Sequence, residues 1–344
     1  MADTIASIVE RVKTRANIPD SSPTLLASTL LQFTQEAMAE DIYPWIHGIN
    51  DEFLLVTEIV PLSVNGVLQY PQARIPFPVR AYGRNLREIV YIDASLNRFN
   101  MPLANLEEQD LFLKNPNQSS LYYAAPAFFV RGDEVVLLTN PKAINSGSLE
   151  MTYSVDIPTF STSTSLTAPI TNIIYSAGTT TITVASATDF NTAVPASTVV
   201  RLDIYRVTTG AYLDINIKCS RSGTTITTTD LSEDDVTQMK AFQSGGFPLT
   251  QGYGSDLVML PAGQNNYSSI PKEVDNYLVI CIAKRYYESI GDTESQKILN
   301  EKFMDTARVN AGKAICQRVT GESKVIANRR GIRAYMQNYA RRRM

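Results

Sequence analysis

The sequence predicts an α+β fold: helical N- and C-terminal segments forming a bundle, a central antiparallel β-sandwich or barrel, and a β-rich insertion. Apolar residues recur at i, i+3, i+4 and i+7 near both ends of the 344-residue chain, which is the spacing of one helix face. In the middle of the chain the apolar period is two, as in strands, and a threonine-rich stretch follows. We place the divisions at 1–50 (N-terminal helices), 51–157 (β-domain), 158–250 (β-rich insertion), 251–316 (C-terminal helices) and 317–344 (basic extension).

Two helices are expected before residue 50. The first follows Asp3, a good capping residue, and carries its apolar stripe at Ile5, Ile8, Val9 and Val12. The second begins at Ser22-Pro23, because serine caps a helix and proline suits its first position, and it closes at Tyr43-Pro44-Trp45. Its apolar stripe is Leu26, Leu30, Phe33 and Ala37.

Short strand-like runs bounded by turn residues fill the section from Asp51 to Ile157. The runs are Phe53–Val56, Ile89–Ile92, Phe128–Val130, Glu134–Leu138 and Leu149–Tyr153. The segment from Phe128 to Leu138 has the pattern of a hairpin around Gly132-Asp133. Many short strands at this spacing favour a sandwich or barrel over alternating βαβ units.

A polar linker, PTFSTSTSLTAP, introduces the insertion, in which we expect five strands. These are Ile170–Tyr175, Thr179–Val184, Val199–Val207, Leu213–Cys219 and Thr224–Thr229. Ser176-Ala177-Gly178 is expected to turn the first hairpin. Threonine favours strands and leaves a hydroxyl for water, so these strands are expected to be partly exposed.

Helices return after Ser269-Ile270-Pro271. The first carries Val274, Leu278, Ile282 and Tyr286 on one face and stops at Gly291. Asp292 caps the next, whose expected buried residues are Ile298, Leu299, Phe303, Ala307 and Ala314. The last 21 residues hold seven basic side chains and no acid, so the rest of this chain of net charge −3 sums to −10.

The composition offers few catalytic or metal-binding possibilities. Cys219, Cys281 and Cys316 are widely spaced, and a buried apolar thiol is the default for each. His47 is the only histidine, and a surface or capping role is expected for it. The acidic run Glu233-Asp234-Asp235 lacks the spacing of a calcium loop, so it is interpreted as a solvated turn. We therefore predict no enzymatic activity, cofactor or metal, and no membrane span.

The basic extension is the strongest asymmetry in the chain. Ile332, Tyr335, Met336 and Tyr339 follow helical spacing among the arginines, which favours a segment that packs on a partner over a purely solubilising tail. Contact with DNA phosphate is the other functional interpretation. The residues expected to dock are Arg329, Arg330, Arg333, Tyr335, Tyr339, Arg341, Arg342 and Arg343.

The sequence resembles the head–tail connector (adaptor) proteins of tailed bacteriophages in three stretches. These are TIASIVERVKTRANIPDSSPTLLASTLLQFTQEAMAEDIYPWI; IPFPVRAYGRNLREIVYIDASLNRFNMPLANLEEQDLF with PAFFVRGDEVVLLTNP and LEMTYSV; and IPKEVDNYLVICIAKRYYESIGDTESQKILNEKF with CQRVTGESKVIANRRGIR. The motifs are a loose consensus and transfer no active-site residue. Residues 158–250 depart from the simplest members of this family.

The resemblance implies a virion protein at the capsid–tail junction, assembled in the host cytoplasm. It implies a homo-oligomeric ring, most often of twelve copies, docked on the portal protein and surrounding the passing genomic DNA without reading its sequence. The next neck or tail protein (a nozzle, tail hub or fibre) would attach to this ring. By position, the basic extension would reach the portal, whose facing surface we expect to be acidic.

Three other classes stay open on the sequence alone. The insertion would bind another virion component or a host-surface glycan in a tail or baseplate protein, and clustered surface aromatics such as Tyr175, Tyr205 and Tyr212 would support this. A cell-wall hydrolase would need a catalytic carboxylate pair, which no feature locates. A nucleic-acid-binding protein would use the basic extension and show steep salt dependence.

Overall fold

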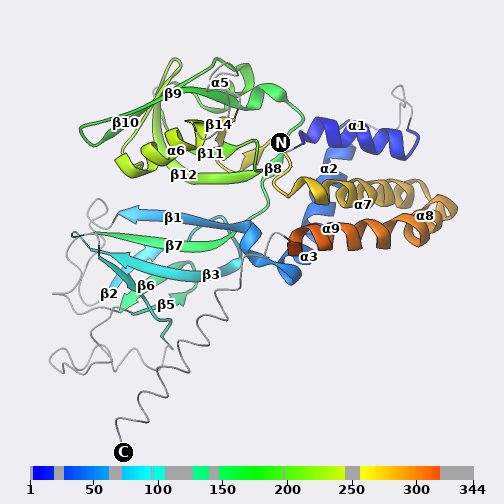
Figure 1. Ribbon diagram of the computed structural model, residues 1–344, viewed down its shortest axis with the longest axis horizontal. Coiled ribbons are helices and arrows are strands. Elements are labelled where there is room, and N and C mark those ends of the chain that lie inside the picture. Colours follow the sequence, from blue (N-terminus) through cyan, green and yellow to red (C-terminus); the bar gives the residue numbers. More distant parts are fainter. Residues whose placement is uncertain are drawn as a thin grey trace, which may run out of the picture. The chain divides into compact units, whose positions relative to one another are not determined.

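Two units account for the chain in the computed structural model, one rich in strands and one helical (Figure 1). The β unit takes in Met1–Ala6 and Asp51–Ser269, and the helical unit Ser7–Asn50 and Ile270–Met344. Within them the structure describes residues 3–18, 27–61, 72–93, 95, 97–104, 127–138, 147–196, 198–244 and 256–317. The predicted α+β class is confirmed, because helices from both ends of the chain form one unit and mainly antiparallel strands form the other.

The first half of the β unit is a sandwich of two antiparallel sheets. One sheet has the order β1 (Leu55–Pro61), β7 (Ser148–Val155), β3 (Ala81–Ile92) and β4 (Arg98–Asn100), and the other the order β2 (Gln72–Pro76), β6 (Glu134–Leu138) and β5 (Ala127–Arg131). Every second residue of β7 is buried, and Leu149 and Met151 share a core with Phe128 and Leu137 of the facing sheet. The apolar residues at every second position therefore form the inward face of the sheet, as predicted. Phe53, expected in the first strand, instead lies in a 3-10 turn, η2 (Asp51–Leu54).

The predicted hairpin between Phe128 and Leu138 is present as β5 and β6. Arg131 pairs with Glu134, so Gly132 and Asp133 form a two-residue turn. Gly132 has φ of 59°, a conformation that costs glycine little because it has no Cβ.

The second half of the β unit is a closed six-stranded barrel. Its order is β10 (Thr179–Val184), β13 (Thr225–Thr228), β12 (Ala211–Ser222), β11 (Val199–Arg206), β14 (Leu257–Pro261) and β9 (Ala168–Ser176). The first five strands along the chain confirm the predicted ones, including the β9–β10 turn at Ala177 and Gly178. The sixth, β14, lies beyond the predicted boundary at 250. All five of its residues are buried, so it lacks the alternation that would indicate a strand.

Short elements complete the β unit. The helices α5 (Thr188–Ala193) and α6 (Glu233–Ser244) add Phe190, Val236 and Met239 to the barrel core. A 3-10 turn, η4 (Thr164–Leu166), precedes β9, and a two-residue parallel pair joins β8 (Thr159–Phe160) to β15 (Gln264–Asn265).

A buried ion pair ties the sandwich to the barrel. Arg80, just before β3, donates to the carboxylate of Asp203 on β11, which is fully buried. The backbone N–H of Asn216 donates to Asp203 Oδ1 at 2.8 Å. The backbone N–H of Gly263 lies 3.3 Å from Asp203 Oδ2, the oxygen that also accepts from Arg80. Burial raises the pKa of Asp203, while Arg80 and these amides oppose the rise by stabilising the carboxylate.

Glu58 extends this polar junction. It accepts a 2.7 Å hydrogen bond from the hydroxyl of Tyr153, and its other oxygen lies 3.3 Å from the side-chain amide of Asn216. Burial, followed by the neighbouring Glu58 charge, raises the pKa of Tyr153, so its hydroxyl keeps its proton and remains a donor. Hydrogen bonds thus link Arg80 to Asp203 and Glu58 to Tyr153 and Asn216 across the two β-bodies, while one terminal nitrogen of Arg80 is buried without a hydrogen-bond partner.

Asp214 gives the β unit a pH-dependent stability. Burial, with a further contribution from Asp235, raises the pKa of Asp214 to about 7. In the unfolded chain the pKa of this carboxyl is about 4. Between the two pKa values folding takes up a proton, so the free energy of unfolding falls as the pH rises. Asp214→Asn should therefore be more stable than the parent protein above pH 7, by up to about 4 kcal/mol, with no advantage below about pH 4.

Urea unfolding measured from about pH 4 to pH 8 tests this expectation. Asp234→Asn, an exposed neighbour of Asp235 on α6, controls for the loss of one negative charge. A difference between Asp214→Asn and the parent that stays constant over this pH range would contradict the assignment.

Helices from both chain ends make up the helical unit. They are α1 (Ile5–Arg15), α2 (Ala27–Ala37), α3 (Tyr43–Ile49), α7 (Lys272–Ile290), α8 (Thr293–Leu299) and α9 (Asp305–Gln317), with two π-helical turns, η1 (Met38–Ile42) and η6 (Asn300–Met304). The central helix α7 packs against both α2 and α9. Gly291 ends α7 with φ of 72°, and Asp292 caps α8 by accepting from the N–H of Ser295 at 3.0 Å, as predicted.

The two π-helical turns correct two predictions. The second helix does not close at Tyr43-Pro44-Trp45, because the chain stays helical through η1 into α3, with Pro44 in the first turn of α3. Ile298 and Phe303 are each 43% exposed and not buried as predicted, although Leu299 and Ala307 are buried. Phe303 lies within η6, whose wider turn shifts the helical phase, whereas Ile298 precedes η6 in α8, where the adjacent Leu299 is the buried residue. None of the described helices combines the length and the apolar composition needed to cross a membrane.

Candidate assembly surfaces of the helical unit

The residues predicted to dock on a partner lie outside the described part of the chain. These are Arg329, Arg330, Arg333, Tyr335, Tyr339, Arg341, Arg342 and Arg343. Their role stays a prediction.

The other sequence candidates fall in structural positions. Glu233, Asp234 and Asp235 form the first turn of α6, where Asp235 and Ser232 cap each other's backbone N–H groups at 2.8 and 3.2 Å. His47 lies half-buried on α3. Across the described residues, histidine, cysteine and acidic side chains form no group of three or more suited to a metal ion.

Cys219, Cys281 and Tyr205 are buried. Burial raises the pKa of the thiols of Cys219 and Cys281 to about 12, so both are protonated, while the side chain of Cys316 is outside the described set. Tyr205 is fully buried and packs edge-to-face on Tyr212, with ring centroids 5.2 Å apart. Tyr205 and Tyr212 therefore belong to the core of the β unit rather than to a cluster of surface aromatics.

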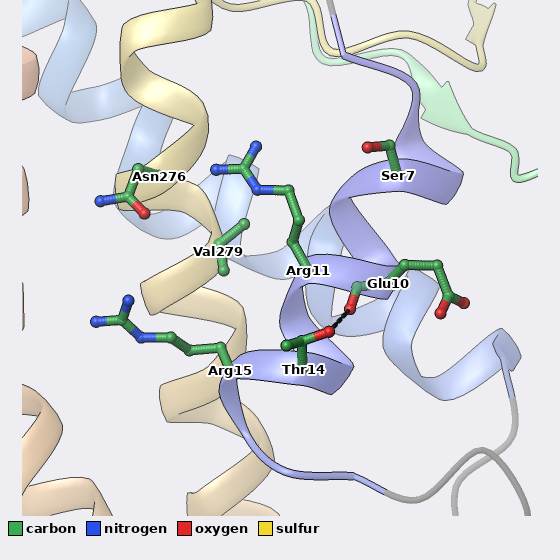
Figure 2. A pocket seen from close by; sticks show the side chains of 7 residues that line it. All are labelled: Ser7, Glu10, Arg11, Thr14, Arg15, Asn276 and Val279. Atoms are coloured by element: carbon green, nitrogen blue, oxygen red, sulfur yellow. Dashed lines mark hydrogen bonds between the residues drawn. The ribbon is translucent and has the colours of Figure 1, made fainter.

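A shallow groove of about 370 Å³ runs between α1 and α7 (Figure 2). The helix α1 buries its apolar face, confirmed at Ile5, Ile8, Val9 and Val12, so its polar residues border the groove. Figure 2 shows Arg11 and Arg15 directed from α1 towards α7, with Asn276 and Val279 opposite them. Ser7, Glu10 and Thr14 complete the lining.

Charged side chains of both signs line the groove. The carboxylate of Glu10 points away from the arginines in Figure 2 and pairs with Lys13 at 2.7 Å, so these two charges balance. The guanidinium of Arg15 lies over the ring of Phe303, 4.4 Å from its centroid. Arg11 and Arg15 are the basic residues in the lining of this surface, which we call the basic groove.

A second charged surface surrounds Arg285 on α7. Its guanidinium donates to Glu40 and Asp41 of η1, each at 2.8 Å, and lies 3.8 Å from Glu36 of α2. Burial lowers the pKa of Arg285, but its hydrogen bonds to Asp41 and Glu40 raise it more, so it stays charged. Three carboxylates around one guanidinium leave a charge of about −2 on this surface, which we call the acidic cluster.

The spacing of charged residues in the sequence predicts part of these two surfaces. Arg11 and Arg15 are four residues apart, as are Glu36 and Glu40, so each pair shares a helix face. The sequence pattern did not indicate that α7 would carry Arg285 to one pair and Asn276 to the other, because that depends on how helices from opposite ends of the chain pack.

The helical unit also exposes apolar side chains. Ile290, Ile298, Phe303 and Val309 are between 43% and 55% exposed and lie within 20 residues of one another at the end of α7 and along α8, η6 and α9. Single exposed apolar residues are ordinary, whereas a contiguous exposed apolar patch is typical of an interaction surface.

Comparison of the chain with models of protein families gave no match, and a search of curated proteins gave none either.

Proposed function

We propose that this protein is a head–tail connector that forms a homo-oligomeric ring on the portal of a tailed bacteriophage and surrounds the path of the DNA. The observation that carries the proposal is the helical unit built from both ends of the chain, with its charged surfaces and its exposed apolar residues from Ile290 to Val309. Such a unit has the surfaces that copies in a ring need for contacts with their neighbours. The resemblance to connector proteins in the same helical segments supports the assignment.

The proposed place of the protein is the virion, at the junction of capsid and tail. Copies would dock on the portal through the basic extension, which follows α9 directly, and the extension would order on binding. The closed ring would then present a platform for the next neck or tail protein. The described residues of the β unit hold 18 acidic and 11 basic side chains, and this excess of negative charge suits a wall that DNA must pass without being held.

Removing residues 325–344 should abolish docking on the portal, because the deletion takes away six of the chain's arginines and the predicted apolar stripe. The measurement is the mass of purified portal mixed with full-length or shortened chain. A full-length variant with glutamine at Arg329, Arg330, Arg333, Arg341, Arg342 and Arg343 separates charge from length. Complete rings of the shortened chain on the portal would refute this role.

A further inference from the structure

Two exposed apolar side chains lie on one side of the helical stretch from α8 to η6. Ile298 and Phe303 are each 43% exposed. In a regular α-helix, residues five apart point about 140° away from each other. The π-helical turn is wider and is hydrogen-bonded from i to i+5, so it brings Phe303 back towards the side of Ile298. Such turns are frequent at functional sites, and here the turn forms an apolar surface, which we call the Ile298/Phe303 surface.

Val309 does not belong to this surface, although it is also exposed. It lies two residues from both Ala307 and Ala311, which are buried residues of α9, and is therefore about 160° from each of them around the helix axis. Val309 thus points away from the packed side of α9. Phe303 borders α1, because the guanidinium of Arg15 lies over its ring.

We propose that the chain's own basic extension folds back and packs its apolar stripe on the Ile298/Phe303 surface until the portal takes up the extension. The stripe consists of Ile332, Tyr335, Met336 and Tyr339. The release by the portal rests on the proposed function, since it requires the extension to dock there. Docking would then uncover the Ile298/Phe303 surface for contact with a neighbouring copy, so that ring assembly would be confined to the portal.

The length of the extension allows it to reach this surface of its own copy. The described part of the chain ends at Gln317, the last residue of α9, and 27 residues follow. Phe303 lies 14 residues before Gln317, about 21 Å along a helix. The 15 residues from Gln317 to Ile332 can span up to about 50 Å. A short tether also holds a segment at about millimolar effective concentration, which favours the chain's own extension over that of another copy.

The chemistry of the two partners is compatible. The stripe spans seven residues, about 10 Å of helix, and the Ile298/Phe303 surface spans five, about 7 Å. The segment from Asp292 to Asp305 has four acids and two lysines, and Arg15 lies over Phe303, which gives a sum of −1. The surface therefore does not repel an extension that carries seven basic residues and no acid.

A photoreactive side chain tests the contact in the full-length protein. Benzoylphenylalanine replaces Phe303 in one preparation and Val309 in another, and each is irradiated at low protein concentration without portal. Position 303 should cross-link to peptides from residues 325–344 of the same chain, and position 309 should not. Irradiating a mixture of isotope-labelled and unlabelled chains shows whether both ends of a cross-link come from one molecule.

A variant without the stripe tests which part of the extension makes the contact. Ile332→Ser/Tyr335→Ser/Tyr339→Ser keeps every arginine and should lower the yield of the cross-link from position 303 at least about tenfold, because the apolar area buried on the surface is lost. Gln337→Ser/Asn338→Ser is the matched control outside the stripe and should cross-link like the parent. Circular dichroism and urea unfolding establish that both variants are folded.

Adding purified portal should lower the yield of the cross-link between position 303 and the extension. The contact would be overturned if position 303 gave no cross-link to the extension, if position 309 gave an equal one, if cross-links joined only different chains, or if the variant without the stripe cross-linked like the parent. An unchanged yield in portal-bound protein would overturn the release. If the parent chain does not bind the portal, the proposed function fails, whereas the contact is judged on the free protein alone.

Discussion

Replacing Arg80 with methionine should lower the free energy of unfolding by about 3–5 kcal/mol, because it leaves the buried carboxylate of Asp203 without its counter-charge. Asp203 has no exposed surface, and the two backbone amides that remain, from Asn216 and Gly263, do not neutralise a full charge. Methionine keeps most of the volume of the arginine stem, so the effect reports charge rather than a cavity.

The double variant Arg80→Met/Asp203→Asn tells a lost ion pair from lost packing. Asparagine is neutral, and its side-chain oxygen can still accept from the N–H of Asn216, so the double variant should be more stable than Arg80→Met alone. Urea unfolding of the parent, both single variants and the double variant completes the cycle. Additive losses would show that Arg80 and Asp203 are not energetically coupled.

Gly147→Ala should destabilise the sandwich by at least about 3 kcal/mol. Gly147 has φ of 123°, which side chains rarely adopt, and an added Cβ would lie 2.1 Å from the backbone oxygen of Ile92. That oxygen belongs to β3, the strand paired with β7, so relief of the clash requires the two strands to separate.

Gly132→Ala is the matched control for backbone strain. Gly132 also has positive φ, but an added Cβ there meets nothing within 4 Å. We expect it to cost about 1 kcal/mol, the price of the left-handed conformation alone. Equal losses at the two glycines would contradict the close strand contact at Gly147.

The spacing of apolar residues predicted most of the fold because it records which face of each element is buried. It predicted the five strands from β9 to β13 and the buried face of α1. It failed at β14, whose residues are all buried, and at Phe303, where a π-helical turn changes the phase. No residue pattern marks such a turn, so tertiary packing decided those positions.

The candidate surfaces were predictable only in part. The paired arginines of α1 and the paired glutamates of α2 are visible in the sequence, but such charge pairs are also common on solvated helices. Whether these pairs belong to distinct surfaces depends on α7, which places Arg285 on one side and Asn276 on the other. The basic extension was predicted from its charge, and the residues proposed to dock there lie outside the described structure.

The central claim is that this chain works as a ring of identical copies on a portal. Its most direct test is the mass of the purified full-length protein, measured alone and after mixing with purified portal. We expect the portal complex to gain one discrete mass increment that corresponds to a fixed number of copies of the 38.0 kDa chain. A chain that remains monomeric and leaves the mass of the portal unchanged would contradict the account.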